Sequence, residues 1–147
     1  MMLTRIRALA AGLWAGMLLT IGGLAAPTLF ALLDRGEAGR VAGRYFWLEA
    51  RTSIALAVLL IVIERMRVRG HVAGATPRQF TVELMLALGA LLCTIAGFEV
   101  IEPLMEQARQ GQGSWSFASL HAVSSSFFAA KIVIVLILAW RCCGQPR

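Results

Sequence analysis

Five side chains in the apolar second half of the sequence are of types that could support chemistry. Glu99 and Glu102 lie three residues apart near the end of one apolar run, so on a helix their carboxylates share a face. His121, Ser124 and Lys131 lie in the next apolar run. Ionisable groups are costly in hydrocarbon and usually face a partner or a water-filled cavity. We therefore expect partners for these side chains elsewhere in the chain.

A structural interpretation of this set is an ion-pair network that fixes helix register. One of the two glutamates would be held by Arg44 or Arg51, and His121 would be hydrogen-bonded at the helix interface. Arg51 has a simpler alternative, because a long basic side chain just inside a membrane can snorkel to the interface or pair locally with Glu49 or Glu37.

Three chemical interpretations compete with the structural one. Glu99, Glu102 and His121 could form a metal site, because carboxylates and imidazole suit several divalent ions. The serine run that starts at Ser124, together with Lys131, suggests a proton or small-solute path, which predicts that Lys131→Met abolishes flux in vesicles without unfolding the protein. Hydrolysis with Ser124 and His121 has the least support, since the sequence shows neither a strained turn nor a set of oxyanion donors.

The composition indicates a membrane protein whose first partner is the lipid bilayer. Of the 147 residues, 59% are hydrophobic and 15% are charged, whereas about 25% are charged in an average soluble domain. The net charge of +6 does not point to nucleic acid, because the basic residues flank apolar runs instead of forming a hydrophilic face with aromatics. Cys93, Cys142 and Cys143 form no CxxC or Cys/His zinc spacing, so neither a disulfide framework nor a structural metal is indicated.

Four apolar runs predict an all-α fold, a polytopic four-helix bundle with antiparallel up-down topology and a single transmembrane domain over residues 1–147. The spans are predicted at roughly residues 8–33, 47–64, 79–104 and 117–141. The first run also resembles a signal peptide, but its apolar sequence continues too far and favours an uncleaved anchor. Asp34 is a candidate helix cap, Pro27 is expected to kink the first span, and Pro103 is expected to distort or end the third.

The distribution of arginines predicts the orientation. The opposite ends of the four spans differ in their basic residues, and one end holds Arg5, Arg7, Arg65, Arg67, Arg69, Arg78, Arg141 and Arg147. The other end holds fewer arginines, and acidic residues dilute them. The positive-inside rule therefore places both termini in the cytoplasm. We expect a multi-pass membrane protein.

The spacing along the helices predicts the depth of each polar group. The third and fourth spans are joined by a short loop and should be antiparallel neighbours. The two carboxylates of the third span then lie at about the depth of His121, near the outer surface. Lys131 lies about 15 Å further inward at 1.5 Å per residue. Its nearest expected acidic partners are Glu83 and the Glu99 group.

Three segments resemble a known family. They are Ala26 to Phe30 (APTLF), Arg35 to Phe46 with its VAGRYF ending, and Leu120 to Ser125 (LHAVSS). Together they are similar to the signature of small bacterial membrane proteins in domain-of-unknown-function family 4149 (DUF4149). The resemblance implies four transmembrane helices, kinship with eukaryotic transmembrane protein 205, and a more remote kinship with CopD copper-resistance proteins and their haem- or metal-handling relatives. It implies no known activity, and this chain lacks an array of Met and His ligands on several helices.

These observations lead to two expectations about function. The first is a non-enzymatic integral protein of the bacterial inner membrane, either a structural or accessory subunit or a small-solute or metal-tolerance factor. The second is a metal- or haem-linked membrane component that uses His121 with Glu99 and Glu102. Elemental analysis and an absorption spectrum of the protein and of His121→Ala would separate them. Glycine-rich faces on the first two helices favour a homo-oligomer or a larger membrane complex.

Overall fold

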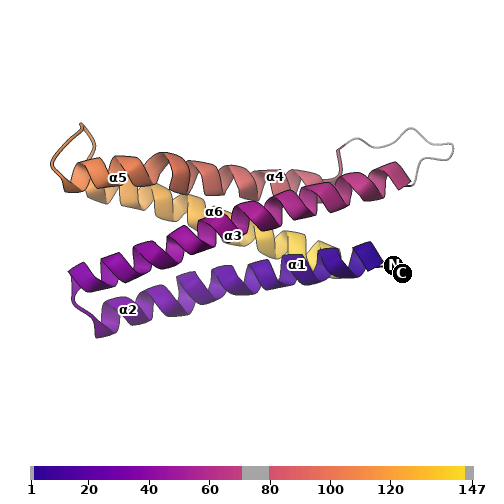
Figure 1. The fold of residues 1–147 in the computed structure, drawn as a ribbon, viewed down its shortest axis with the longest axis horizontal. Coiled ribbons are helices and arrows are strands. Elements are labelled where there is room, and N and C mark those ends of the chain that lie inside the picture. The colour runs from indigo at the N-terminus through magenta and orange to yellow at the C-terminus, as the bar shows by residue number, and fades with distance from the viewer. Residues whose placement is uncertain (1, 71–79, 145–147) are drawn as a thin grey trace.

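The computed structural model describes residues 2–70 and 80–144. Within these ranges every regular element is a helix, and four long helical stretches form an up-down antiparallel bundle (Figure 1). Each stretch is long and apolar enough to cross a membrane, and together they cover Met2–Leu32, Arg35–Val68, Val82–Arg109 and Phe117–Cys143. The predicted all-α class with four membrane-length helices is confirmed. Figure 1 places both chain ends at one end of the bundle, here called the terminal end, and the opposite end is called the loop end.

The first and third stretches each contain a π-helical segment. The first stretch consists of α1 (Met2–Leu19), η1 (Thr20–Ala25) and α2 (Ala26–Leu32). The third stretch consists of α4 (Val82–Thr94), η2 (Ile95–Val100) and α5 (Ile101–Arg109). Pro27 and Pro103 follow the two π-helical segments. A proline lacks an N–H and crowds the carbonyl four residues before it, and those carbonyls belong to Gly23 and Glu99, inside η1 and η2. The wider π turn accommodates the proline, so the third helix continues past Pro103 to Arg109.

The second and fourth stretches are single helices, α3 (Arg35–Gly70) and α6 (Phe117–Cys143). Helix α3 begins 12 residues before the predicted span at residue 47, because Asp34 caps it: Asp34 Oδ1 accepts hydrogen bonds from the backbone N–H of Gly36 at 2.8 Å and of Glu37 at 3.0 Å. Two of the arginines used to predict the orientation lie outside the described residues, namely Arg78 in the basic connection and Arg147 at the chain end.

The four stretches pack as a square. Helix α1 packs against α3 and α6, and α4 packs against the same two helices. Helices α3 and α6 therefore lie on a diagonal, and a side chain that joins them has to cross the middle of the bundle. The predicted contact between the third and fourth spans is present, since both α4 and α5 pack on α6.

The apolar core fills the part of the bundle toward the terminal end. Small side chains from all four stretches surround a few large ones, and its buried members are Ala10, Ala11, Trp14, Ala15, Leu18, Ala57, Leu60, Ala87, Ala90, Val135, Leu138 and Cys142. Alanine at so many positions lets the helix backbones approach closely. Large apolar side chains such as Leu9, Leu92 and Trp140 are exposed on the outside, as a surface that faces lipid requires.

Candidate functional site

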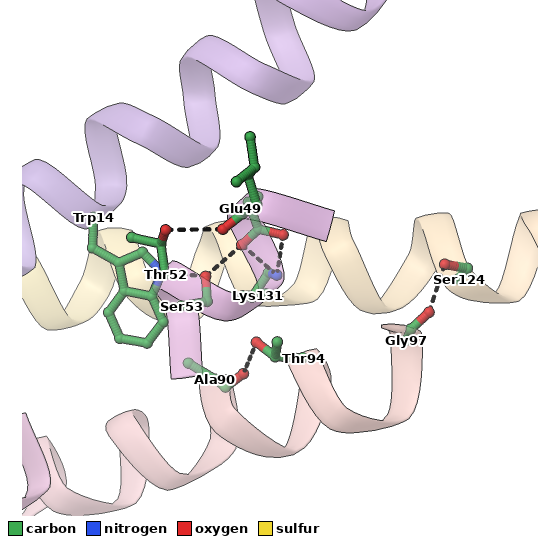
Figure 2. Close-up of polar contacts among 10 residues, drawn as sticks. Trp14, Glu49, Thr52, Ser53, Ala90, Thr94, Gly97, Ser124 and Lys131 are labelled. Atoms are coloured by element: carbon green, nitrogen blue, oxygen red, sulfur yellow. Dashed lines mark hydrogen bonds and ion pairs between the residues drawn. The ribbon is translucent and has the colours of Figure 1, made fainter. Parts of the chain in front are cut away.

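A buried ion pair crosses the centre of the bundle between α3 and α6. The ammonium of Lys131 donates hydrogen bonds to both carboxylate oxygens of Glu49, at 2.7 Å to Oε1 and 2.9 Å to Oε2 (Figure 2). The two residues are 3% and 2% exposed. Lys131 lies about 21 Å from the first residue of α6 and about 18 Å from the last, at 1.5 Å per residue. The pair is therefore close to the middle of a membrane-length helix.

Two further side chains extend this pair to α1. Ser53 lies one helical turn after Glu49, so both face the bundle interior, and its hydroxyl donates to Glu49 Oε1. The indole Nε1 of Trp14 donates to the Ser53 hydroxyl oxygen at 2.8 Å (Figure 2). We call Trp14, Glu49, Ser53 and Lys131 the central network. It joins three of the four helical stretches by polar contacts alone.

An aromatic ring covers the ion pair on its loop-end side. Phe128 lies one turn before Lys131, and the ammonium nitrogen is 5.0 Å from the centre of its ring. The same ring packs against Phe46 in a T-shaped arrangement, with ring centres 5.2 Å apart and planes at 89°. Gly22 in η1 leaves room for this ring, because a Cβ at that position would lie 2.6 Å from a Phe128 ring carbon. The pair is thus enclosed by apolar side chains.

The predicted polar set is only partly brought together. Arg51 Nη1 lies 3.1 Å from Glu99 Oε1, and both side chains are partly exposed. The expectation that Arg51 pairs locally is wrong, because its guanidinium reaches the neighbouring helical stretch instead. Arg44 lies over the ring of Trp47 at 4.4 Å and does not pair with either predicted glutamate. One of the two arginines therefore holds one of the two carboxylates.

The residues predicted to bind metal do not form a ligand set. Glu102 Oε1 lies 3.7 Å from Arg109 Nη1, and the exposed His121 stacks on Phe117 with ring centres 5.7 Å apart. Among the residues that the structure describes, no three His, Cys, Asp or Glu side chains are grouped so that they could hold a metal ion. In the described part of the chain, Glu99, Glu102 and His121 are thus not grouped as three ligands of one metal ion.

The serine run serves helix packing. Ser124 Oγ donates to the backbone carbonyl of Gly97 in η2 at 2.8 Å (Figure 2), and Ser126 Oγ donates to the carbonyl of Ala122 at 2.8 Å. Gly97 lies so close to α6 that a Cβ there would be 2.9 Å from the Cβ of Phe127. The hydroxyl of Ser124 therefore ties α6 to η2 at a close helix contact.

The predicted partners of Lys131 are wrong. Glu83 pairs with Arg141, whose Nη2 is 3.0 Å away, and Glu99 pairs with α3. The true partner, Glu49, adjoins an aromatic, arginine-containing stretch and therefore looked interfacial in the sequence. A usable signal was present, since Glu49 and Ser53 continue the helical face that carries the buried Ala57.

A comparison with protein families gives one match. Residues 9–114 match the model of a family described as a domain of unknown function, DUF4149. The matched range includes Glu49 and ends before α6, so it does not include Lys131. No curated protein and no solved structure matches the chain.

Proposed function

The chain belongs to the DUF4149 family, whose function is unknown, and we propose that it acts as a non-enzymatic accessory subunit of a membrane complex. Its four apolar helices make it a multi-pass membrane protein. The excess of arginines at the terminal end favours an orientation with both termini in the cytoplasm, and we assign it to the bacterial inner membrane.

The completeness of the central network carries this proposal. A binding or catalytic site has polar groups that are available to a ligand, whereas the charged groups of Glu49 and Lys131 are paired with each other. In the described part of the chain, the buried side-chain nitrogen and oxygen atoms without a hydrogen-bond partner are two nitrogens of Arg7, which is not a member of this network and lies about 10 Å along α1 from Trp14. A buried ion pair adds little stability over an apolar pair of similar volume, but it can specify one arrangement of helices. The network therefore supports a role in setting how α3 and α6 align.

The outer faces of the bundle suit a protein that packs against other membrane helices. Gly12 and Gly16 in α1, and Gly39 and Gly43 in α3, each lie one turn apart, and a Cβ at any of them would meet nothing within 4 Å. Small residues at a spacing of four let transmembrane helices approach closely. These faces are open within the chain itself, which supports contact with a partner helix.

Purification from the native membrane tests the accessory role. The tagged protein, extracted in mild detergent, is expected to elute as a complex of fixed stoichiometry with another membrane protein, as measured by native mass spectrometry. Gly12→Leu should release the partner without lowering thermal stability, because a Cβ at this position would meet nothing within 4 Å in this chain. Leu13→Phe is the matched control, since Leu13 is 64% exposed beside it. A protein that is only ever monomeric would overturn the proposal.

Proton or small-solute movement is the second candidate, and the position of Lys131 favours it. An ionisable pair near the middle of a membrane-length helix is the usual element of a proton route. Ser124 and Phe128 lie on the same face of α6, toward the loop end. This candidate predicts a proton flux in vesicles that depends on the Glu49–Lys131 pair.

A further inference from the structure

A second buried charged group lies at the terminal end of the bundle. Arg7 is 1% exposed, although it lies near the start of α1. Its Nη1 donates to Glu64 Oε2 at 2.9 Å, and the same oxygen accepts from Arg67 Nη1 at 3.1 Å. The other two nitrogens of Arg7, Nε and Nη2, are buried and have no acceptor. From its position before an apolar run, Arg7 was expected only to mark the topology.

The two unpaired nitrogens lie on the same edge of the guanidinium. The N–H groups of Nε and Nη2 point in parallel, and this edge forms the two-bond contact with a carboxylate or a phosphate. A buried donor without an acceptor is unfavourable, so an oxyanion that met both groups would be held strongly. The acidic side chains of the described residues at this end are already engaged, since Glu64 binds Arg7 through Nη1 and Glu83 binds Arg141.

The depth of Arg7 places it next to the headgroup region of the membrane. The stretch Met2–Leu32 has 31 residues. At 1.5 Å per residue it is about 45 Å long, against about 30 Å for the hydrocarbon core, so about 8 Å extends beyond the core at each end. Arg7 lies about 8 Å from Met2 along the helix, at the boundary between hydrocarbon and headgroups. Arg5 and Arg65 are exposed at the same end and make the surface positive.

We propose that the Nε and Nη2 edge of Arg7 binds a phosphate-type oxyanion, supplied by the headgroup of an anionic phospholipid. Glu64 holds the guanidinium through its opposite side and fixes the direction of this edge. Because the edge is enclosed, the headgroup enters only when neighbouring side chains move, and it should leave slowly. A bound lipid is therefore expected to survive purification in mild detergent. This lipid site is independent of the accessory role.

Lipid binding to the purified full chain tests the site. Native mass spectrometry would compare short-chain phosphatidylglycerol, short-chain phosphatidylcholine and inorganic phosphate on the wild type, Arg7→Lys and Arg5→Lys. Both substitutions keep the charge, but only Arg7→Lys removes the paired edge. We expect phosphatidylglycerol to bind the wild type and Arg5→Lys about tenfold more tightly than Arg7→Lys. The difference corresponds to the one charge-assisted contact that Arg7→Lys loses. If inorganic phosphate bound as tightly as phosphatidylglycerol, the oxyanion site would be supported and its ligand would be free phosphate.

A measurement on the wild type keeps the test valid if Arg7→Lys does not fold. In lipid bilayers that contain phosphatidylglycerol, ³¹P should dephase the ¹⁵N signals of Arg7 Nε and Nη2 in a dipolar recoupling experiment, while those of Arg5 change less. No dephasing at Arg7, or equal lipid binding by wild type and a folded Arg7→Lys, would overturn the proposal.

Discussion

Replacing Lys131 by methionine should strongly destabilise the bundle. Methionine has a similar length and no charge, so it removes the two hydrogen bonds of 2.7 and 2.9 Å to Glu49 and leaves that carboxylate buried at 2% exposure. Removing one partner of a buried ion pair costs about 3 to 5 kcal/mol of unfolding free energy. The Ser53 hydroxyl can still donate to Glu49, but one neutral hydrogen bond contributes only about 1 kcal/mol.

Removing both charges should restore most of this loss. In Glu49→Met/Lys131→Met no unpaired charge remains, and an apolar replacement of a buried pair is often neutral. Ser53 loses its acceptor, but a serine in a helix can donate to the backbone carbonyl four residues before it. We therefore expect the double variant within about 1 kcal/mol of the wild type, and a coupling energy of at least about 5 kcal/mol in the double-mutant cycle, because each single variant should lose about 3 kcal/mol or more.

Denaturant titration in detergent micelles, followed by tryptophan fluorescence, would measure these changes. Glu37→Gln is the matched control, because the Glu37–Arg40 pair is 3.8 Å long and exposed. Such a surface pair should change stability by less than about 0.5 kcal/mol. A loss below about 1 kcal/mol in Lys131→Met, or a double variant as unstable as the worse single variant, would refute the structural role of the pair.

Three other substitutions, with Gly39→Ala as a control, test further contacts in the bundle by the same titration. Gly97→Ala should cost about 1 to 3 kcal/mol, because its Cβ would lie 2.9 Å from an α6 side chain, whereas Gly39→Ala, with open space, should be neutral or slightly stabilising. Trp14→Phe should cost about 1 kcal/mol or more, since the 2.8 Å hydrogen bond to Ser53 is lost. Arg51→Gln should cost less than about 1 kcal/mol, because its ion pair is half exposed; a larger loss would mean that this pair is shielded.

The number and class of the helices could be predicted because they depend on apolar length. As a helix, each of the four runs has a length close to the thickness of a bilayer. The cap at Asp34 follows from the chemistry of its side chain, which accepts hydrogen bonds from backbone N–H groups. The path of the third helix past Pro103 could not be predicted, since it depends on the π turn of η2 that precedes the proline. Local sequence does not show when a helix will widen by one residue.

The partners of the buried charges were harder to predict because they depend on which helices face each other. Lys131 was recognised as buried from its apolar surroundings, but Glu49 is on the diagonal helix, which the order of the helices along the chain does not reveal. Arg7 shows the same difficulty. An arginine before an apolar run usually marks topology, and its burial against Glu64 follows only from the contact between α1 and α3.

Proton flux across vesicles that contain the purified protein tests most directly whether the central pair holds the fold or moves charge. Wild type and Glu49→Met/Lys131→Met would be reconstituted at equal density, with a pH-sensitive dye inside and an imposed pH gradient. A structural pair predicts that both proteins leak protons no faster than empty vesicles. A wild-type flux that the folded double variant abolishes would contradict the accessory role and establish Glu49 and Lys131 as a proton route.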